Sequence, residues 1–229
     1  AMVRGAFEYQ GQKCSALSRA FIPRSLWPQV EAALLAETRR LEAGDVADFR
    51  SFLGAVIDRR AFETLKAIID GAEASPDCQV LCGGYDDSVG YFIRPTVILA
   101  RRRDAPTMLG ELFGPILTVY VYEDADLDDT LRYCNDSTPY ALTGSIFARD
   151  RQAICHMEHL LRNAAGNLYI NDKPTGAVVG QQPFGGGRAS GTNDKAGSPM
   201  NLYRWMSLCT IKECFAPPSD VGYPSMTEA

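Results

Sequence analysis

The sequence is poor in the residues that build metal centres. It has two histidines and no Cys-x-x-Cys pair. Cys155, His156 and His159 form the one group with ligand chemistry, and on a helix Cys155 and His159 share a face. A zinc site needs three or four ligands at defined spacing. We therefore expect ordinary helix residues here, and no metal.

The chain also lacks an excess of positive charge and a long apolar run. Its 23 Lys+Arg stand against 28 Asp+Glu, for a net charge of -5. Nucleic-acid binding draws on clustered positive charge, so no nucleic-acid partner is expected. No apolar run approaches the roughly 20 residues that span a bilayer, and no signal-peptide pattern opens the chain. Membrane insertion and secretion are therefore disfavoured. A targeting segment upstream of the given residues remains an open alternative.

Seven cysteines are scattered along the 229 residues. An odd number in a chain long enough to build a core favours free thiols in a reducing compartment over a disulfide framework.

Helical and strand-like patterns alternate along the chain. Helical spacing follows Ser25, a candidate N-cap, and runs to Leu41 before Gly44. Three further helices are predicted, over residues 58–72, 126–135 and 150–162. Strands are predicted over residues 79–82, 91–99, 116–122, 143–147 and 167–170, with a late one over 202–215. Strands separated by helices indicate crossovers and a mostly parallel sheet flanked by helices. The fold class is α/β.

Cys14 has the most suggestive setting of the seven thiols. It stands among small and polar residues, where a thiolate can attack an aldehyde carbon and backbone amides can hold the resulting oxyanion. A small packed cysteine is the competing interpretation. A protease-like pair with His156 or His159 is disfavoured, because both histidines fall on an amphipathic helix. Residues 185–188 lack the P-loop spacing.

Three separated segments together resemble the aldehyde dehydrogenase superfamily. They are its nucleophile motif at residues 7–16 (FEYQGQKCSA), its E-x-F-G-P motif at 111–115 (ELFGP) and its late P-F-G-G motif at 183–186. Residues 162–167 (RNAAGN), 180–186 (GQQPFGG) and 189–195 (ASGTNDK) resemble the branch that oxidises L-glutamate γ-semialdehyde, the open form of pyrroline-5-carboxylate, in proline catabolism. The resemblance extends to about residue 215.

The resemblance implies a role for each matching residue. Cys14 is the nucleophile, and its backbone N–H is half of an oxyanion hole. NAD is the cofactor, with Glu111 on the nicotinamide ribose and Phe113 beside it. The remaining implied roles concern the substrate. Ser15, Gly176 and Ala177 bind its carboxylate, and Phe184 contacts its aliphatic part. A purely structural role stays open for these residues. Glu111 is then a solvated carboxylate, Phe113 and Phe184 are core aromatics, Gly176 serves a tight turn, and Ser15 bonds to the local backbone.

Residues 1–200 then form the thiol-bearing catalytic domain, and 201–229 an oligomerisation strand and extended tail. Members of this superfamily are about twice as long, and their first half holds the NAD domain, an oxyanion-hole Asn and a general-base Glu. The resemblance therefore implies a catalytic portion that is a poor catalyst alone. Gly110 departs from the pattern, since many relatives carry an acidic residue there.

The expected partners are a small aldehyde and, in the longer protein, further copies of the same subunit. The location implied is the mitochondrial matrix for a eukaryotic protein and the cytoplasm for a bacterial one. Two other functions stay open: a non-catalytic scaffold with this fold, and a dehydrogenase for another semialdehyde.

Overall fold

The structure is a computed structural model that describes residues 1–226. Its main sheet has the order β1-β4-β3-β2. The strands are β1 (Arg19–Pro23), β4 (Ile116–Tyr122), β3 (Phe92–Ala100) and β2 (Cys78–Asp86). β4 pairs parallel with both β1 and β3, and β2 pairs antiparallel at the edge. The sheet is therefore mixed, with the parallel strands at the side that carries β1.

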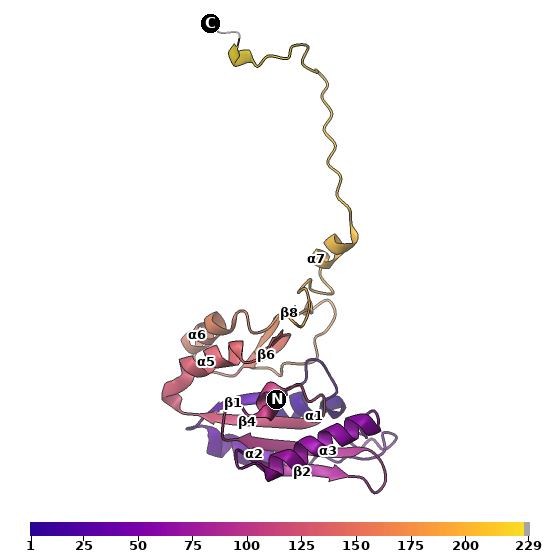
Figure 1. The fold of residues 1–229 in the computed structure, drawn as a ribbon, viewed down its shortest axis with the longest axis vertical. Helices are drawn as coiled ribbons and strands as arrows, with labels where there is room; N and C mark the ends of the chain where they lie inside the picture. The colour runs from indigo at the N-terminus through magenta and orange to yellow at the C-terminus, as the bar shows by residue number, and fades with distance from the viewer. Residues whose placement is uncertain (227–229) are drawn as a thin grey trace.

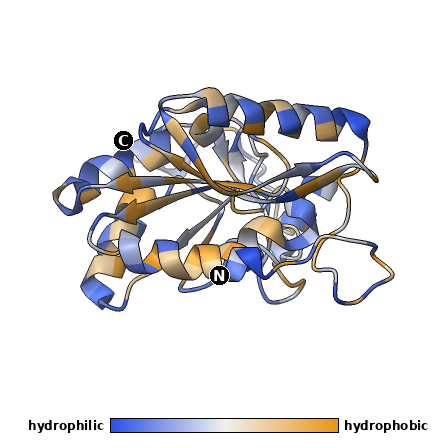
Figure 2. Cartoon of the chain, turned by 90° about the horizontal axis from the view of Figure 1, so that it is seen from below, coloured by the Kyte–Doolittle hydropathy of each residue, from blue (hydrophilic) through white to orange (hydrophobic). Residues whose placement is uncertain are grey.

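Helices cover both faces of this sheet (Figures 1 and 2). One face packs against α3 (Arg59–Ala74), whose Leu65 and Ile69 meet Ile98. The other face packs against α1 (Met2–Phe7) and α2 (Trp27–Arg39). Successive residues of a strand point to opposite faces of the sheet. Alternate residues of β3 and β4 are therefore buried under α3 on one face and under α1 and α2 on the other. This three-layer core fixes the ends of β1 and β4, next to which the candidate site lies.

A smaller lobe adjoins the sheet. Its strands β6 (Thr143–Ile146) and β7 (Asn167–Ile170) pair parallel. The helices α5 (Leu127–Asp136) and α6 (Arg151–Leu161) pack on them through a core that includes Leu131, Ile146 and Leu161. The shorter elements are α4 (Pro106–Leu109), α7 (Pro199–Leu202), β5 (Tyr140–Ala141), β8 (Gly187–Arg188), η1 (Glu8–Gly11), η2 (Asp124–Asp126), η3 (Tyr203–Trp205) and η4 (Pro224–Met226).

The predicted helices and the first five predicted strands are confirmed to within a few residues, except that β2 extends further, to Asp86. The sequence analysis missed β1, a short strand that ends in proline. Ser25 is not an N-cap: α2 begins after Leu26, and the Ser25 backbone N–H donates to Asp124 at 3.0 Å. Cys155, His156 and His159 lie on α6 as expected, and His156 Nε2 lies 2.6 Å from Asp128 Oδ1.

No strand forms over residues 202–215 within this chain, and pairing of this segment with a second subunit stays a prediction. α7 and η3 end at Trp205, and residues 206–214 have no regular secondary structure. The segment projects away from the body of the molecule (Figure 1). A strand needs a neighbour to pair its backbone groups, and within residues 1–226 no strand pairs with this segment.

Two further properties follow from the described residues. All seven cysteines are free thiols, as the odd count predicted. Among residues 1–226, no helix combines the length and the apolar character needed to cross a membrane.

Candidate functional site

Cys14 lies on an exposed turn between η1 and β1. The turn is closed by the Ala16 N–H, which donates to the Lys13 carbonyl at 3.0 Å. Before it the backbone passes through three left-handed residues, Tyr9, Gln10 and Gly11, with φ values of 56°, 57° and 63°. Such conformations cost free energy in non-glycine residues and concentrate at functional sites. They redirect the chain so that the Cys14 thiol reaches the surface.

Gly11 joins this turn to the segment that carries Glu111 and Phe113. A Cβ atom added at Gly11 would lie 2.3 Å from the Gly114 carbonyl oxygen and 2.9 Å from the Ala6 carbonyl oxygen. The two backbones therefore approach more closely than any side chain allows. This contact places the nucleophile motif against the E-x-F-G-P motif, which stands about a hundred residues later.

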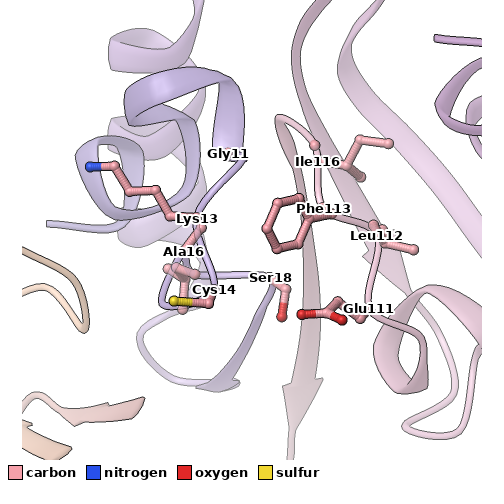
Figure 3. Close-up of a pocket in the computed structure, with 11 residues that line it drawn as sticks. Gly11, Lys13, Cys14, Ala16, Ser18, Glu111, Leu112, Phe113 and Ile116 are labelled. Carbon is pink, nitrogen blue, oxygen red and sulfur yellow. The ribbon is translucent and has the colours of Figure 1, made fainter. Parts of the chain in front are cut away.

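Cys14, Glu111 and Phe113 line one cavity of about 60 Å³ (Figure 3). The Cys14 turn faces Glu111 and the Phe113 ring, while Lys13 directs its amine away from both. Glu111 is exposed. Phe113 is 48% exposed and has a left-handed backbone, with φ 56°. The strained backbone holds an aromatic ring partly in solvent across the cavity from the Cys14 turn, whose sulfur points away from the ring in Figure 3; a packed core residue would not be held in this way.

A second cavity, of about 270 Å³, also borders Cys14. Cys14 and Glu111 line both cavities. The second is also lined by Arg19 at the start of β1, by residues around α4, and by residues of the smaller lobe and the later loop, among them Tyr140 and Ser190. The thiol thus stands at the junction between the two parts of the molecule.

Ser15 turns inward where Cys14 turns outward. Its side chain is buried, and its Oγ lies 2.8 Å from Thr175 Oγ1. This hydrogen bond connects the nucleophile turn with the glycine-rich loop after β7. Gly176 and Ala177 follow directly, and Gly176 has a φ of 85°, which favours glycine. The structure therefore connects Gly176 and Ala177 to the Cys14 turn through the contact of Ser15 with Thr175, while Ser15, Gly176 and Ala177 line neither the cavity shared with Glu111 and Phe113 nor the second one.

Phe184 lies apart from these groups. It is half-buried, lines neither cavity, and forms a two-residue bridge with Ala196, with N–H to carbonyl distances of 2.9 and 2.8 Å. Asn167 at the start of β7 fixes its surroundings: the amide donates to the Pro183 carbonyl at 3.0 Å and accepts from the Gly185 N–H at 3.1 Å. The segment is held firmly, but its contact with a substrate stays a prediction.

Four charged or polar residues at the site escaped the sequence analysis: Glu8, Lys13, Lys173 and Thr175. Glu8 Oε2 accepts from Lys13 Nζ at 2.9 Å and lies 3.7 Å from Lys173 Nζ. The hydrogen bond from Lys13 lowers the pKa of the Glu8 carboxyl, partial burial opposes the shift, and the positive charges nearby add to it. Nothing in the local sequence pairs Glu8 with Lys173, because the two meet only through the fold.

Comparison with known proteins assigns the chain to a family. The profile of the aldehyde dehydrogenase family matches residues 1–211. The mitochondrial delta-1-pyrroline-5-carboxylate dehydrogenases of Dictyostelium discoideum and Homo sapiens are 56% and 50% identical to it, over 99% and 98% of this chain and 41% and 40% of their own lengths.

Solved structures agree. The delta-pyrroline-5-carboxylate dehydrogenase of Mycobacterium tuberculosis matches with a TM-score of 0.86 and 51% identity, over 98% of this chain and 42% of that one. The same enzyme bound with NAD gives a TM-score of 0.85 and 52% identity. The chain thus spans about two fifths of the length of these relatives. With motifs, fold and family profile in agreement over nearly all its residues, the chain belongs to the aldehyde dehydrogenase family.

Proposed function

We propose that this chain is the thiol-bearing portion of an NAD-dependent dehydrogenase that oxidises L-glutamate γ-semialdehyde to L-glutamate. One observation carries the proposal: Cys14 is exposed in a cavity that it shares with Glu111 and Phe113, while its neighbour Ser15 reaches the loop of Gly176. These positions support a site in which Cys14 is the nucleophile, Glu111 and Phe113 contact the cofactor, and the Ser15 and Gly176 segments contact the substrate's carboxylate.

The Cys14 thiolate attacks the aldehyde carbon and forms a thiohemiacetal. Loss of hydride from that carbon gives a thioester, and water then displaces the thiolate to release the carboxylic acid. Among residues 1–226, no group accepts a hydrogen bond from the Cys14 N–H. That N–H is available to the oxyanion that forms in each addition step.

Glu111 and Phe113 have the chemistry to hold a nicotinamide nucleotide. An exposed carboxylate accepts hydrogen bonds from ribose hydroxyls, and the Phe113 ring offers a flat apolar surface in the cavity that Cys14 also lines. When bound, NAD accepts the hydride. The residues of this chain orient the ribose and keep the aldehyde carbon at the thiol.

Ser15, Gly176 and Ala177 bind the substrate's carboxylate. The amides of Gly176 and Ala177 have no acceptor within the described part of the chain, and a hydroxyl with two free N–H groups forms an anion-binding nest. Phe184 contacts the aliphatic part of the substrate, in a segment that Asn167 holds in place.

The matched relatives are more than twice as long as this chain. We propose that the second oxyanion donor, the general base and most of the NAD site belong to the part of these relatives that the chain does not cover, and that the longer protein is a homo-oligomer. A mitochondrial matrix location is proposed for a eukaryotic source, in keeping with the names of the relatives.

Formation of NADH from L-glutamate γ-semialdehyde tests the function. We expect little turnover from the 229 residues alone, and turnover when the preceding portion of the Mycobacterium tuberculosis relative is fused before them. Cys14→Ala in the fusion should lower kcat by at least about 10³-fold, because the nucleophile is lost, whereas Cys209→Ala should not. Turnover that survives Cys14→Ala would overturn the proposal.

A further inference from the structure

Glu8 stands between two lysines from distant parts of the chain. Its Oε2 accepts a hydrogen bond from Lys13 at 2.9 Å and forms a longer ion pair with Lys173 at 3.7 Å. The three side chains are 34%, 28% and 22% exposed. Pairs this well shielded are screened less than pairs in open solvent. Glu8 therefore ties the segment before Cys14 to the loop after β7.

A second connection returns from that loop to the turn. Lys173 Nζ donates to the Thr175 carbonyl at 2.9 Å, and Thr175 Oγ1 lies 2.8 Å from Ser15 Oγ. Together these contacts form a continuous chain of interactions. It runs from Lys13 through Glu8, Lys173 and Thr175 back to Ser15. Cys14 is the residue between these two ends.

These interactions also set the direction of one backbone amide. The peptide unit is planar and trans, so the N–H of Gly176 points opposite to the Thr175 carbonyl that Lys173 holds. A Cβ added at Gly176 would lie 2.5 Å from Lys173 Nζ. Glycine therefore leaves space for the ammonium group as well as permitting the φ of 85°.

We propose that Glu8 and Lys173 are positioning residues, a latch that locks the Cys14 turn to the loop of residues 175–177. The latch aims the Gly176 N–H at the carboxylate of a substrate bonded to Cys14. It selects aldehydes that carry a carboxylate at the far end of a five-carbon chain. This inference rests on the proposed function, whose carboxylate contacts it explains.

A latch and a simple charge effect predict opposite results for Glu8. If Glu8 acts only through its charge, its removal lessens the repulsion of an anionic reagent and speeds the reaction at Cys14. If Glu8 positions the loop, its removal releases Lys173 and slows the reaction of that reagent. Glu8→Ala therefore separates the two explanations by the sign of the effect.

The quantity measured is the rate at which each cysteine of the 229-residue chain is labelled, which peptide mass spectrometry monitors over time. The two probes are 3-carboxypropyl methanethiosulfonate, which is an acid, and its neutral carboxamide. Once the acid probe has labelled Cys14, its carboxylate carbon is five bonds from the Cys14 sulfur, as in the proposed thiohemiacetal. Exposed Cys209 is the internal reference. We expect the acid-to-amide rate ratio at Cys14, divided by that at Cys209, to exceed one.

Glu8→Ala and Lys173→Met should each lower this normalised ratio by roughly threefold, the effect of a contact worth less than 1 kcal/mol. Lys173→Arg should restore it, because a guanidinium also donates to both partners. Lys66→Met is the matched control: Lys66 is 29% exposed and lies 3.2 Å from Asp87, away from both cavities. Where the parent chain prefers the acid probe, a ratio that rises or stays unchanged in Glu8→Ala overturns the latch.

Amide hydrogen exchange separates failure of the latch from failure of the proposed function. The latch predicts faster exchange in residues 173–178 on Glu8→Ala, although Glu8 is far away in the sequence. Unchanged exchange there overturns the latch whatever the labelling shows. If exchange accelerates but the unmodified chain shows no preference for the acid probe, the latch stands as a structural connection, and its selective role and the carboxylate contacts of the proposed function are both refuted.

Discussion

Replacing Gly11 by alanine should separate the two motifs that form the candidate site. The new Cβ would lie 2.3 Å from the Gly114 carbonyl oxygen and 2.6 Å from its carbonyl carbon. Both contacts are with backbone, which has no alternative rotamer to adopt. Residues Gly11 and Gly114 must therefore move apart, and Glu111 and Phe113 move with the latter.

The cost of Gly11→Ala can be worked from two contributions. A left-handed conformation costs an L-residue about 1–2 kcal/mol, and overpacking a tight site costs about 1–3 kcal/mol. The free energy of unfolding should therefore fall by about 2–5 kcal/mol, measured by urea denaturation. The labelling rate of Cys14 should change as well, because the turn loses its support.

Gly71→Ala is the matched control for this prediction. Gly71 lies within α3, and a Cβ there meets no atom within 4 Å. Alanine is the better helix former by about 0.5–1 kcal/mol, so this variant should be slightly more stable than the parent chain. If Gly11→Ala unfolds within about 0.5 kcal/mol of the parent, which is the range of ordinary surface substitutions, the close contact between the two motifs is refuted.

Three further predictions concern the same region. Ser15→Ala should lower the free energy of unfolding by about 1–3 kcal/mol, because Thr175 Oγ1 loses its buried partner, while Ser15→Ala with Thr175→Val should recover most of the loss in urea titrations. The pKa of Glu8 is lowered from its ordinary value of 4.5, so its contribution to stability is present above that pH and is lost as the pH falls through the lowered pKa; Glu8→Gln should flatten this part of the pH–stability curve, and an unchanged curve would contradict the ion pairs. Leu65→Ala should cost about 2–5 kcal/mol by thermal or urea unfolding, since Leu65 is 1% exposed between α3 and the sheet, and a loss below about 1 kcal/mol would argue against that packing.

The sequence predicted the parts of the molecule whose signals are local. The helix predicted over residues 58–72 has an amphipathic pattern, and α3 forms there; the structure adds that Asp58 is its N-cap and accepts from the Ala61 N–H at 2.7 Å. The buried strand at Ile116–Tyr122 is likewise marked by its own residues, and β4 has those bounds. Cys14 and Glu111 were predicted through motifs, and the fold brings both to one cavity.

The parts that escaped prediction depend on contacts between distant residues. β1 is short and ends in Pro23, so its pairing with β4 defines it more than its composition does. The tail has the apolar residues of a strand, but pairing partners decide whether they form one. The contact between Glu8 and Lys173 has no sequence signature either, since it exists only once η1 lies beside the loop after β7.

Covalent chemistry at Cys14 tests the central claim most directly. The 229-residue chain is mixed with 5-oxopentanoate labelled with carbon-13 at the aldehyde carbon, which lacks the amino group needed to form a cyclic imine. The account predicts a thiohemiacetal resonance that disappears in Cys14→Ala and persists in Cys209→Ala. A resonance that survives the loss of Cys14, or that never forms in the parent chain, would contradict it.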